Sequence, residues 1–247
     1  MALIHSIESQ GNWLFKRRGQ IPVLLFLLAI PAVYLIKYEE LDPVRVTIVN
    51  YSAAILSILG AIVRAYTIGT TPRGTSGRNT QEQVAESLNT SGIYSMVRHP
   101  LYLGNYLMWI GIVLFTQNFE FVIIVSLLYW IYYERIMFAE ERFLEKKFGN
   151  VYLDWSKKVP AFFPRFSSFY SSETKFSMKS VFRREYSGIL ATVFGFVYVE
   201  FLIGWFRWNT IAIGRNLIYL FCATLLITII LRTLKHSTKL LNEEGRS

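Results

Sequence analysis

The chain has 247 residues, of which 53% are hydrophobic, with a mean hydropathy of +0.33 and a formal net charge of +9. This is more apolar side chain than a soluble core of this size requires, and it indicates a membrane protein. The one cysteine, Cys222, excludes a disulfide framework or a cysteine-rich metal site, and the three histidines lack metal-binding spacing, so we expect no metal.

Six apolar stretches approach the roughly 20 residues that a helix needs to cross a bilayer. In chain order they are 21–36, 46–68, 102–116, 119–133, 188–206 and 217–231. The stretch 102–116 is short and has to borrow residues at its ends. The sequence therefore predicts an all-α fold: a polytopic integral membrane helical bundle of about six transmembrane helices with cytoplasmic catalytic loops.

Four parts follow from this pattern. We expect an N-terminal transmembrane helix pair at 1–68 and a core at 69–166 that holds two spans and an amphipathic C-terminal segment. A linker rich in serine and threonine is expected at 167–187, and a C-terminal transmembrane helix pair at 188–247.

Lys and Arg are distributed unevenly between the two sides of these spans. If the basic cluster 16–18 is cytoplasmic, the basic loops 69–101, 134–187 and 232–247 share its side. The other side keeps only Lys37, Arg45, Arg207 and Arg215. This is the positive-inside pattern, so both termini are expected in the cytoplasm and the net charge needs no nucleic-acid partner.

Glu200 lies inside the predicted span 188–206, where an unpaired carboxylate is costly. We expect an ion pair with Arg215 of the next helix to compensate its charge. A catalytic role for Glu200 is the alternative.

The first unusual segment, 90–104, precedes and enters the span 102–116. Its polar and special residues include Tyr94, Arg98, His99, Pro100, Tyr102 and Gly104. Pro100 suits the first turn of a helix, which would leave Arg98 and His99 at the positive end of that helix, where backbone N–H groups hold anions. A headgroup anchor and a helix cap are equally compatible with the spacing.

The second unusual segment begins with the adjacent carboxylates Glu140 and Glu141, beyond the predicted span 119–133. Glu134 and Arg135 lie one to two turns earlier. Adjacent carboxylates at a membrane boundary are costly unless a cation meets them. A solvated face, with Arg135 and Arg142 as partners, is the alternative to a binding site.

The ordered motifs carry a resemblance. Over about residues 79–164 the chain resembles the isoprenylcysteine carboxyl methyltransferase and phospholipid methyltransferase superfamily. The resemblance rests on five elements in order: Ser-Gly-x-Tyr-x-x-x-Arg-His-Pro-x-Tyr-x-Gly, a span pair, Glu-Glu-x-x-Leu, Phe-Gly-x-x-Tyr and Val-Pro-x-x-x-Pro. The resemblance implies an S-adenosylmethionine-dependent methyltransferase whose core is 69–166. The cofactor-binding residues that it implies are Tyr94, Arg98, His99, Pro100, Tyr102, Glu140 and Glu141, with Leu88 and Asn89 in a stretch that departs from the family's pattern.

The acceptor is a separate question. The loop 70–80 contains Arg73 and Arg78, and arginine forks suit phosphate oxygens. This favours O-methylation of a lipid phosphate, as in the lipid A phosphate methyltransferases of the superfamily, in a bacterial inner membrane. Arg73, Arg78 and Arg135, which falls near the family's substrate-side arginine, are then the candidate catalytic residues. A loop that merely follows the positive-inside pattern is the alternative.

Two other acceptors remain open. N-methylation of phosphatidylethanolamine needs a proton acceptor, for which Glu134 or Glu200 are candidates. Carboxyl methylation of isoprenylcysteine needs none. A transporter or a non-catalytic membrane protein is the alternative from another class, and the absence of internal repeats disfavours a transporter. The sequence indicates a membrane lipid substrate but no oligomeric state.

Overall fold

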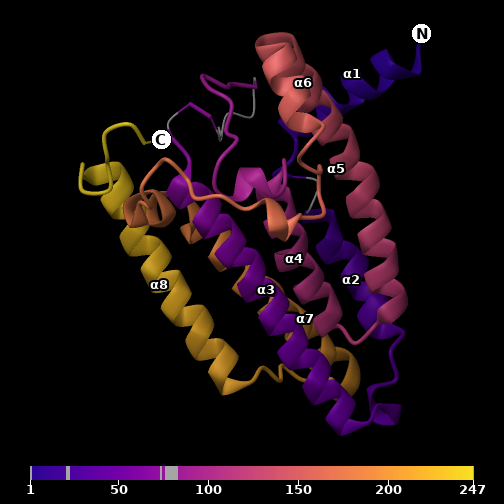
Figure 1. Cartoon of the computed structure of the whole chain (residues 1–247). Helices are drawn as coiled ribbons and strands as arrows, with labels where there is room; N and C mark the ends of the chain where they lie inside the picture. The colour runs from indigo at the N-terminus through magenta and orange to yellow at the C-terminus, as the bar shows by residue number, and fades with distance from the viewer. Residues whose placement is uncertain (1, 21–22, 73, 76–82, 247) are drawn as a thin grey trace.

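The computed structural model describes residues 2–20, 23–72, 74–75 and 83–246. In these ranges the chain forms helices joined by loops and short 3-10 turns, and no strands (Figure 1). The α-helices are α1 Leu3–Lys16, α2 Leu24–Tyr34, α3 Pro43–Thr70, α4 Pro100–Phe115, α5 Phe119–Phe148, α6 Asn150–Ser156, α7 Met178–Trp208 and α8 Arg215–Ser237. The predicted all-α fold is confirmed.

The helices differ in whether they are long enough to cross a bilayer. Within the described chain, α3, α5, α7 and α8 are long and apolar enough to span, whereas α2 and α4 are apolar but have only 11 and 16 residues. The six predicted stretches each correspond to one helix, with α2 and α4 as the short ones. The protein is a helical membrane bundle.

The core of the bundle is the pair α3 and α4, which pack on each other most extensively. Gly104 on α4 permits this close contact, because a Cβ there would lie 2.5 Å from Cγ of Arg64 on α3. Helix α7 packs against α2, α3 and α4, and α8 lies at the edge of the bundle, packed mainly on α7 (Figure 1).

Two boundaries differ from the prediction. Helix α7 begins at Met178, inside the predicted linker 167–187, because the hydroxyl of Ser177 accepts a hydrogen bond from the backbone N–H of Ser180 and caps the helix. One of the serines that indicated a linker, Ser177, is therefore a helix cap. Helix α1, which the sequence did not predict, is too short to span and packs on α5 through Gly11. The division into four parts stays a prediction.

The expected ion pair between Glu200 and Arg215 is not found. Arg215 is exposed at the first position of α8, and in the described part of the chain the buried Oε2 of Glu200 has no hydrogen-bond partner. The register of the α7–α8 connection explains the difference. It places the backbone of Gly214 beside Glu200, where a Cβ would lie 3.3 Å from Oε1.

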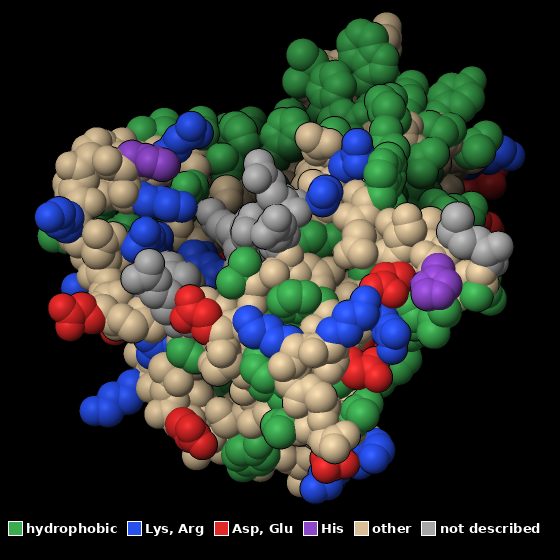
Figure 2. Space-filling view, turned by 90° about the horizontal axis from the view of Figure 1, so that it is seen from above, with side chains coloured by type: hydrophobic (Ala, Val, Ile, Leu, Met, Phe, Trp, Pro, Cys, Tyr) green, Lys and Arg blue, Asp and Glu red, His purple; other side chains and the backbone are tan. Residues whose placement is uncertain are grey.

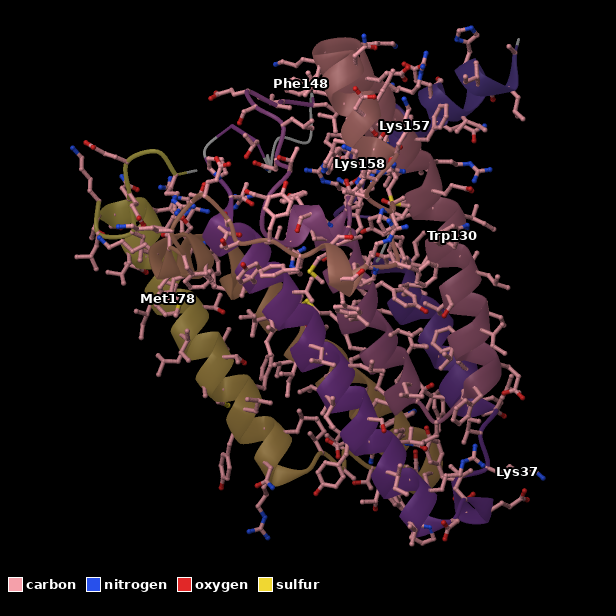
Figure 3. All side chains as sticks on the ribbon, in the orientation of Figure 1. Lys37, Trp130, Phe148, Lys157, Lys158 and Met178 are labelled. Atoms are coloured by element: carbon pink, nitrogen blue, oxygen red, sulfur yellow. The ribbon has the colours of Figure 1, made fainter. Side chains whose placement is uncertain are left out.

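Both ends of the chain lie at the same end of the bundle (Figure 1). Lys157 and Lys158 lie toward that end, whereas Lys37 projects from the opposite end (Figure 3). Figure 2 shows Lys and Arg side chains spread over the end that carries the termini. The arrangement agrees with the alternation from which the sidedness was predicted.

Candidate active site

The segment before α4 is held by backbone hydrogen bonds to a distant part of the chain. The N–H of Arg98 donates to the carbonyl of Pro160 at 2.9 Å, and the N–H of His99 donates to the carbonyl of Ala161 at 3.2 Å. Gly92 has a φ of 61°, a conformation that favours glycine. The Arg-His-Pro motif and the Val-Pro motif are therefore hydrogen-bonded to each other, although they are far apart in the sequence.

His99 occupies the N-cap position of α4, and two carboxylates of α5 meet it there. Its Nε2 lies 2.9 Å from Oε1 of Glu141, and its Nδ1 lies 3.6 Å from Oε2 of Glu140. The hydroxyl of Tyr102 donates to Oε1 of Glu140 at 2.7 Å. Helix α5 continues beyond the predicted end of its span at Tyr133, and this extension carries both carboxylates to His99.

The two carboxylates control the charge of His99. Burial by itself lowers the pKa of the imidazole, but the hydrogen bonds and charges of Glu140 and Glu141 outweigh burial and raise the pKa above its usual range. Burial in turn raises the pKa of the Glu141 carboxyl, and this effect is outweighed by His99 and Arg98, which lower it. A carboxylate therefore faces each ring nitrogen of His99, with a hydrogen bond to Nε2 and a longer ion-pair contact at Nδ1.

Arg98 links this group to α6. Its Nη1 donates to the carbonyl of Ser156 at 2.7 Å. Its Nε lies 3.0 Å from Oε1 of Glu141, in ion-pair contact but without hydrogen-bond geometry. Arg98 is therefore oriented by the motif residues themselves and is more than a headgroup anchor.

These side chains surround a polar cavity of about 500 Å³. The predicted residues that line it are Tyr94, Arg98, His99, Pro100, Tyr102 and Glu140. Glu141 lies behind His99, to which it is hydrogen-bonded. The structure thus brings together the two segments that the sequence singled out.

The cavity lining also contains buried charged residues that were not among the predicted site residues. Nε and Nη2 of Arg64 on α3 each donate to a carboxylate oxygen of Glu185 on α7 at 2.7 Å, and Nη1 donates to Oδ1 of Asn105 on α4 at 2.6 Å. Arg184 is buried and lines the same cavity. Arg64 lies inside the predicted span 46–68, and a cation there was the one available signal for a buried partner.

Other predicted residues do not line the polar cavity. Glu134 is exposed. Arg135 donates from Nε to Gln10 at 2.9 Å and from Nη1 to the carbonyl of Ile131 at 3.0 Å, outside the cavity. Leu88 and Asn89 are also absent from the lining. Arg73 and Arg78 lie outside the described residues.

A second, apolar groove of about 760 Å³ adjoins the polar cavity. Helices α1, α2, α4 and α5 line it, mostly with leucine and aromatic side chains, and Arg135 also contributes. Tyr133 lines both the groove and the polar cavity. The groove and the polar cavity therefore meet at Tyr133.

Residues 49–151 match the sequence profile of the phospholipid methyltransferase family. This segment of the chain is similar to that family. It contains His99, Glu140 and Glu141 together with Arg64, whereas Glu185 lies outside it. The resemblance predicted from the motifs is confirmed, and the matched segment 49–151 carries most of the cavity wall.

Individual relatives cover the same region. The chain is 35% identical over 99 residues to the nickel-cobalt-cadmium resistance protein NccN of Alcaligenes xylosoxydans xylosoxydans, which is 40% of this chain and 44% of that protein. It is 36% identical over 77 residues to the protein-S-isoprenylcysteine O-methyltransferase of Schizosaccharomyces pombe, 31% of this chain and 33% of that protein.

A plant relative extends the match slightly. Protein-S-isoprenylcysteine O-methyltransferase B of Arabidopsis thaliana is 32% identical over 109 residues, 43% of this chain and 55% of that protein. The chain thus spans between a third and about half of the length of these relatives. No solved structure matches.

Proposed function

We propose that the chain is a membrane methyltransferase that uses S-adenosylmethionine and methylates an anionic oxygen on a lipid-anchored acceptor. The observation that carries this proposal is the meeting of His99 with Glu140 and Glu141 at a polar cavity, directly beside an apolar groove. The family of residues 49–151 supports the reaction class.

The residues of the polar cavity fit this cofactor. Its volume of about 500 Å³ is in the range of small-molecule sites. Glu140, Tyr94 and Tyr102 offer a carboxylate and aromatic rings, which suit the positive groups of the cofactor, and Arg98 and His99 suit its carboxylate. When bound, S-adenosylmethionine supplies a methyl group activated by a sulfonium.

The protein's contribution to the reaction is orientation. Methyl transfer from a sulfonium is an in-line displacement, for which positioning contributes roughly 7–11 kcal/mol. The ion pairs of His99 and Arg64 hold side chains of the cavity lining in place, so the lining does not have to reorganise around its ligands.

An acceptor that is already anionic fits these walls best. Glu140 accepts a hydrogen bond from Tyr102, and both oxygens of Glu185 accept from Arg64. Of the described residues that line the cavity, neither carboxylate is therefore set up to remove a proton from an ammonium. Glu134 and Glu200, the bases considered for N-methylation, do not line the cavity.

A carboxylate is the acceptor that we favour. The names of two relatives specify isoprenylcysteine, whose carboxylate needs no base and whose apolar tail suits the groove. No relative's name supports the lipid A phosphate that the loop 70–80 suggested. Arg73 and Arg78 of that loop lie outside the described residues. N-methylation of phosphatidylethanolamine is the weaker alternative because it needs a base.

We place the polar cavity at the cytoplasmic face because the basic loops surround it, as the positive-inside rule requires. Both termini are then cytoplasmic. The bacterial inner membrane expected from the sequence stays a prediction.

The experiment combines cofactor binding with acceptor identification. The purified protein is titrated with S-adenosylmethionine by calorimetry, then incubated with methyl-labelled cofactor and either a farnesylated cysteine or total bacterial lipid. Release of labelled methanol by mild alkali identifies a carboxyl methyl ester, whereas label on nitrogen is retained. Absence of both cofactor binding and label transfer contradicts the proposed function, and transfer to lipid alone contradicts only the acceptor.

A further inference from the structure

A third cavity lies on the other side of the bundle from the apolar groove, between α3, α7 and α8. It has a volume of about 770 Å³ and shares no lining residue with the polar cavity. We call it the α8 groove; its lining includes Asn50, Ala61, Ile189, Glu200, Asn216 and Leu220. Helix α8 packs mainly on α7, so this space remains between α8 and α3.

The α8 groove is polar at one end and apolar at the other. The polar end lies near the first turns of α3 and α8, where Asn50, Glu200 and Asn216 line it. The more apolar part includes Ile58, about two turns beyond Asn50 on α3, and Leu220, about one turn beyond Asn216 on α8. This polarity matches a lipid whose headgroup lies at the helix starts and whose chains run along the helices.

Glu200 determines which headgroup fits. Its Oε2 is buried and has no hydrogen-bond partner among the residues that the structure describes. The hydroxyl of Thr47, which lines the same groove, already donates to the carbonyl of Pro43. A buried carboxylate oxygen without a donor is unfavourable, so a ligand that brings a donor is stabilised there.

Glu200 also lies close to the start of α8. Its carboxylate lies beside Gly214, immediately before α8 begins at Arg215. The amino end of a helix carries partial positive charge, which stabilises a nearby anion. A cationic donor is therefore a better match to Oε2 than a neutral one.

We propose that the α8 groove binds a membrane phospholipid whose headgroup carries a primary ammonium, with the ammonium donating to Glu200. Exposed Arg215, one residue from Gly214 and Asn216 of the groove, is placed to meet the phosphate of the same headgroup. The lipid is held as a bound component and not as the methyl acceptor, because this groove and the polar cavity are separate.

The test is lipid retention measured by native mass spectrometry. The full chain is released from vesicles that contain equal parts of phosphatidylethanolamine, phosphatidylcholine and phosphatidylglycerol. We expect the wild type to retain phosphatidylethanolamine preferentially, because its ammonium has three donors. Retention of phosphatidylglycerol to the same extent overturns the proposal, whatever the variants do.

Variants locate the site. Glu200→Gln is expected to reduce phosphatidylethanolamine retention about tenfold through loss of one charge-assisted hydrogen bond. Ala61→Phe, which fills the apolar end, is expected to reduce it as well. Glu120→Gln removes an exposed carboxylate at the start of α5 and is expected to change nothing.

Cofactor binding separates this proposal from the proposed function. Both groove variants are expected to bind S-adenosylmethionine as the wild type does, since neither residue lines the polar cavity. Undiminished phosphatidylethanolamine retention in Glu200→Gln overturns the lipid proposal and leaves the methyltransferase proposal intact.

Discussion

Arg64 on α3 and Glu185 on α7 form a bidentate ion pair, with both contacts at 2.7 Å and with 17% and 3% of the side chains exposed. The pair joins the segment 49–151, which is similar to the phospholipid methyltransferase family, to a helix outside that segment. Helix α7 is therefore part of the candidate active site, and the C-terminal helix pair is more than an added membrane anchor.

Removing one member of this pair leaves the other buried without a counter-charge. We expect Glu185→Gln to destabilise the protein by about 3 kcal/mol, since breaking a buried pair on one side costs about 3–5 kcal/mol. Thermal unfolding in detergent measures the effect. Glu173→Gln, on an exposed loop residue, is the control; equal midpoints for the two variants contradict the prediction.

Glu140 is the carboxylate of the Glu pair that lines the cavity. Glu140→Gln removes its charge while keeping its shape, and we expect cofactor affinity to fall about tenfold or more, as for a charged hydrogen bond. Calorimetric titration gives the comparison. Glu145→Gln, on the same helix but paired with Arg142 away from the cavity, is expected to bind normally.

The pH dependence of stability follows from His99. Its pKa is raised on folding above the ordinary value of 6.5, so the folded chain holds the proton more tightly than the unfolded chain does. The stability that His99 contributes is fully present below pH 6.5 and is lost as the pH rises through the raised pKa. The stability advantage of the wild type over His99→Gln is therefore expected to shrink at alkaline pH.

Protonation of Glu141 removes the stabilising effect of the same ion pair at low pH. Its pKa is lowered from the ordinary value of 4.5, so its contribution is present above that value and is lost as the pH falls through the lowered pKa. Denaturant unfolding of the wild type and His99→Gln across this range tests both limits. A difference between the two proteins that does not change with pH argues against a charged His99.

The apolar groove is expected to govern the acceptor and not the cofactor. Leu128 lines the groove, and Leu128→Trp should obstruct it, raising the KM for a lipidated acceptor while leaving the affinity for S-adenosylmethionine unchanged. Leu127→Trp places the same ring at an exposed neighbouring position that does not line the groove. Equal acceptor KM values for both variants contradict the proposal that the acceptor binds in the apolar groove.

Helix α5 shows how far the sequence analysis reached. The predicted span ended at Tyr133, where the apolar run stops, but the helix continues to Phe148. In one continuous helix Tyr133 and Glu140 are two turns apart and share a face, and both line the polar cavity. Glu134 is rotated by about 100° from Tyr133, which is why a residue so near the site in sequence lies outside it.

What the sequence by itself determined is local. Hydropathy identified the helices and their alternation, and the spacing of the Arg-His-Pro and Glu-Glu motifs identified the family and the residues that meet at His99. These features depend on neighbours within a few turns of the chain, so they can be read from it directly.

Only the tertiary structure decided which distant side chains complete the site. Arg64 and Glu185 are 121 positions apart, and their pairing depends on how α3 and α7 are rotated and packed. The same packing separated Glu200 from Arg215 and left a groove between α3 and α8. Charge pairing in a bundle requires atoms to meet within a few ångströms, and no pattern along one chain specifies that contact.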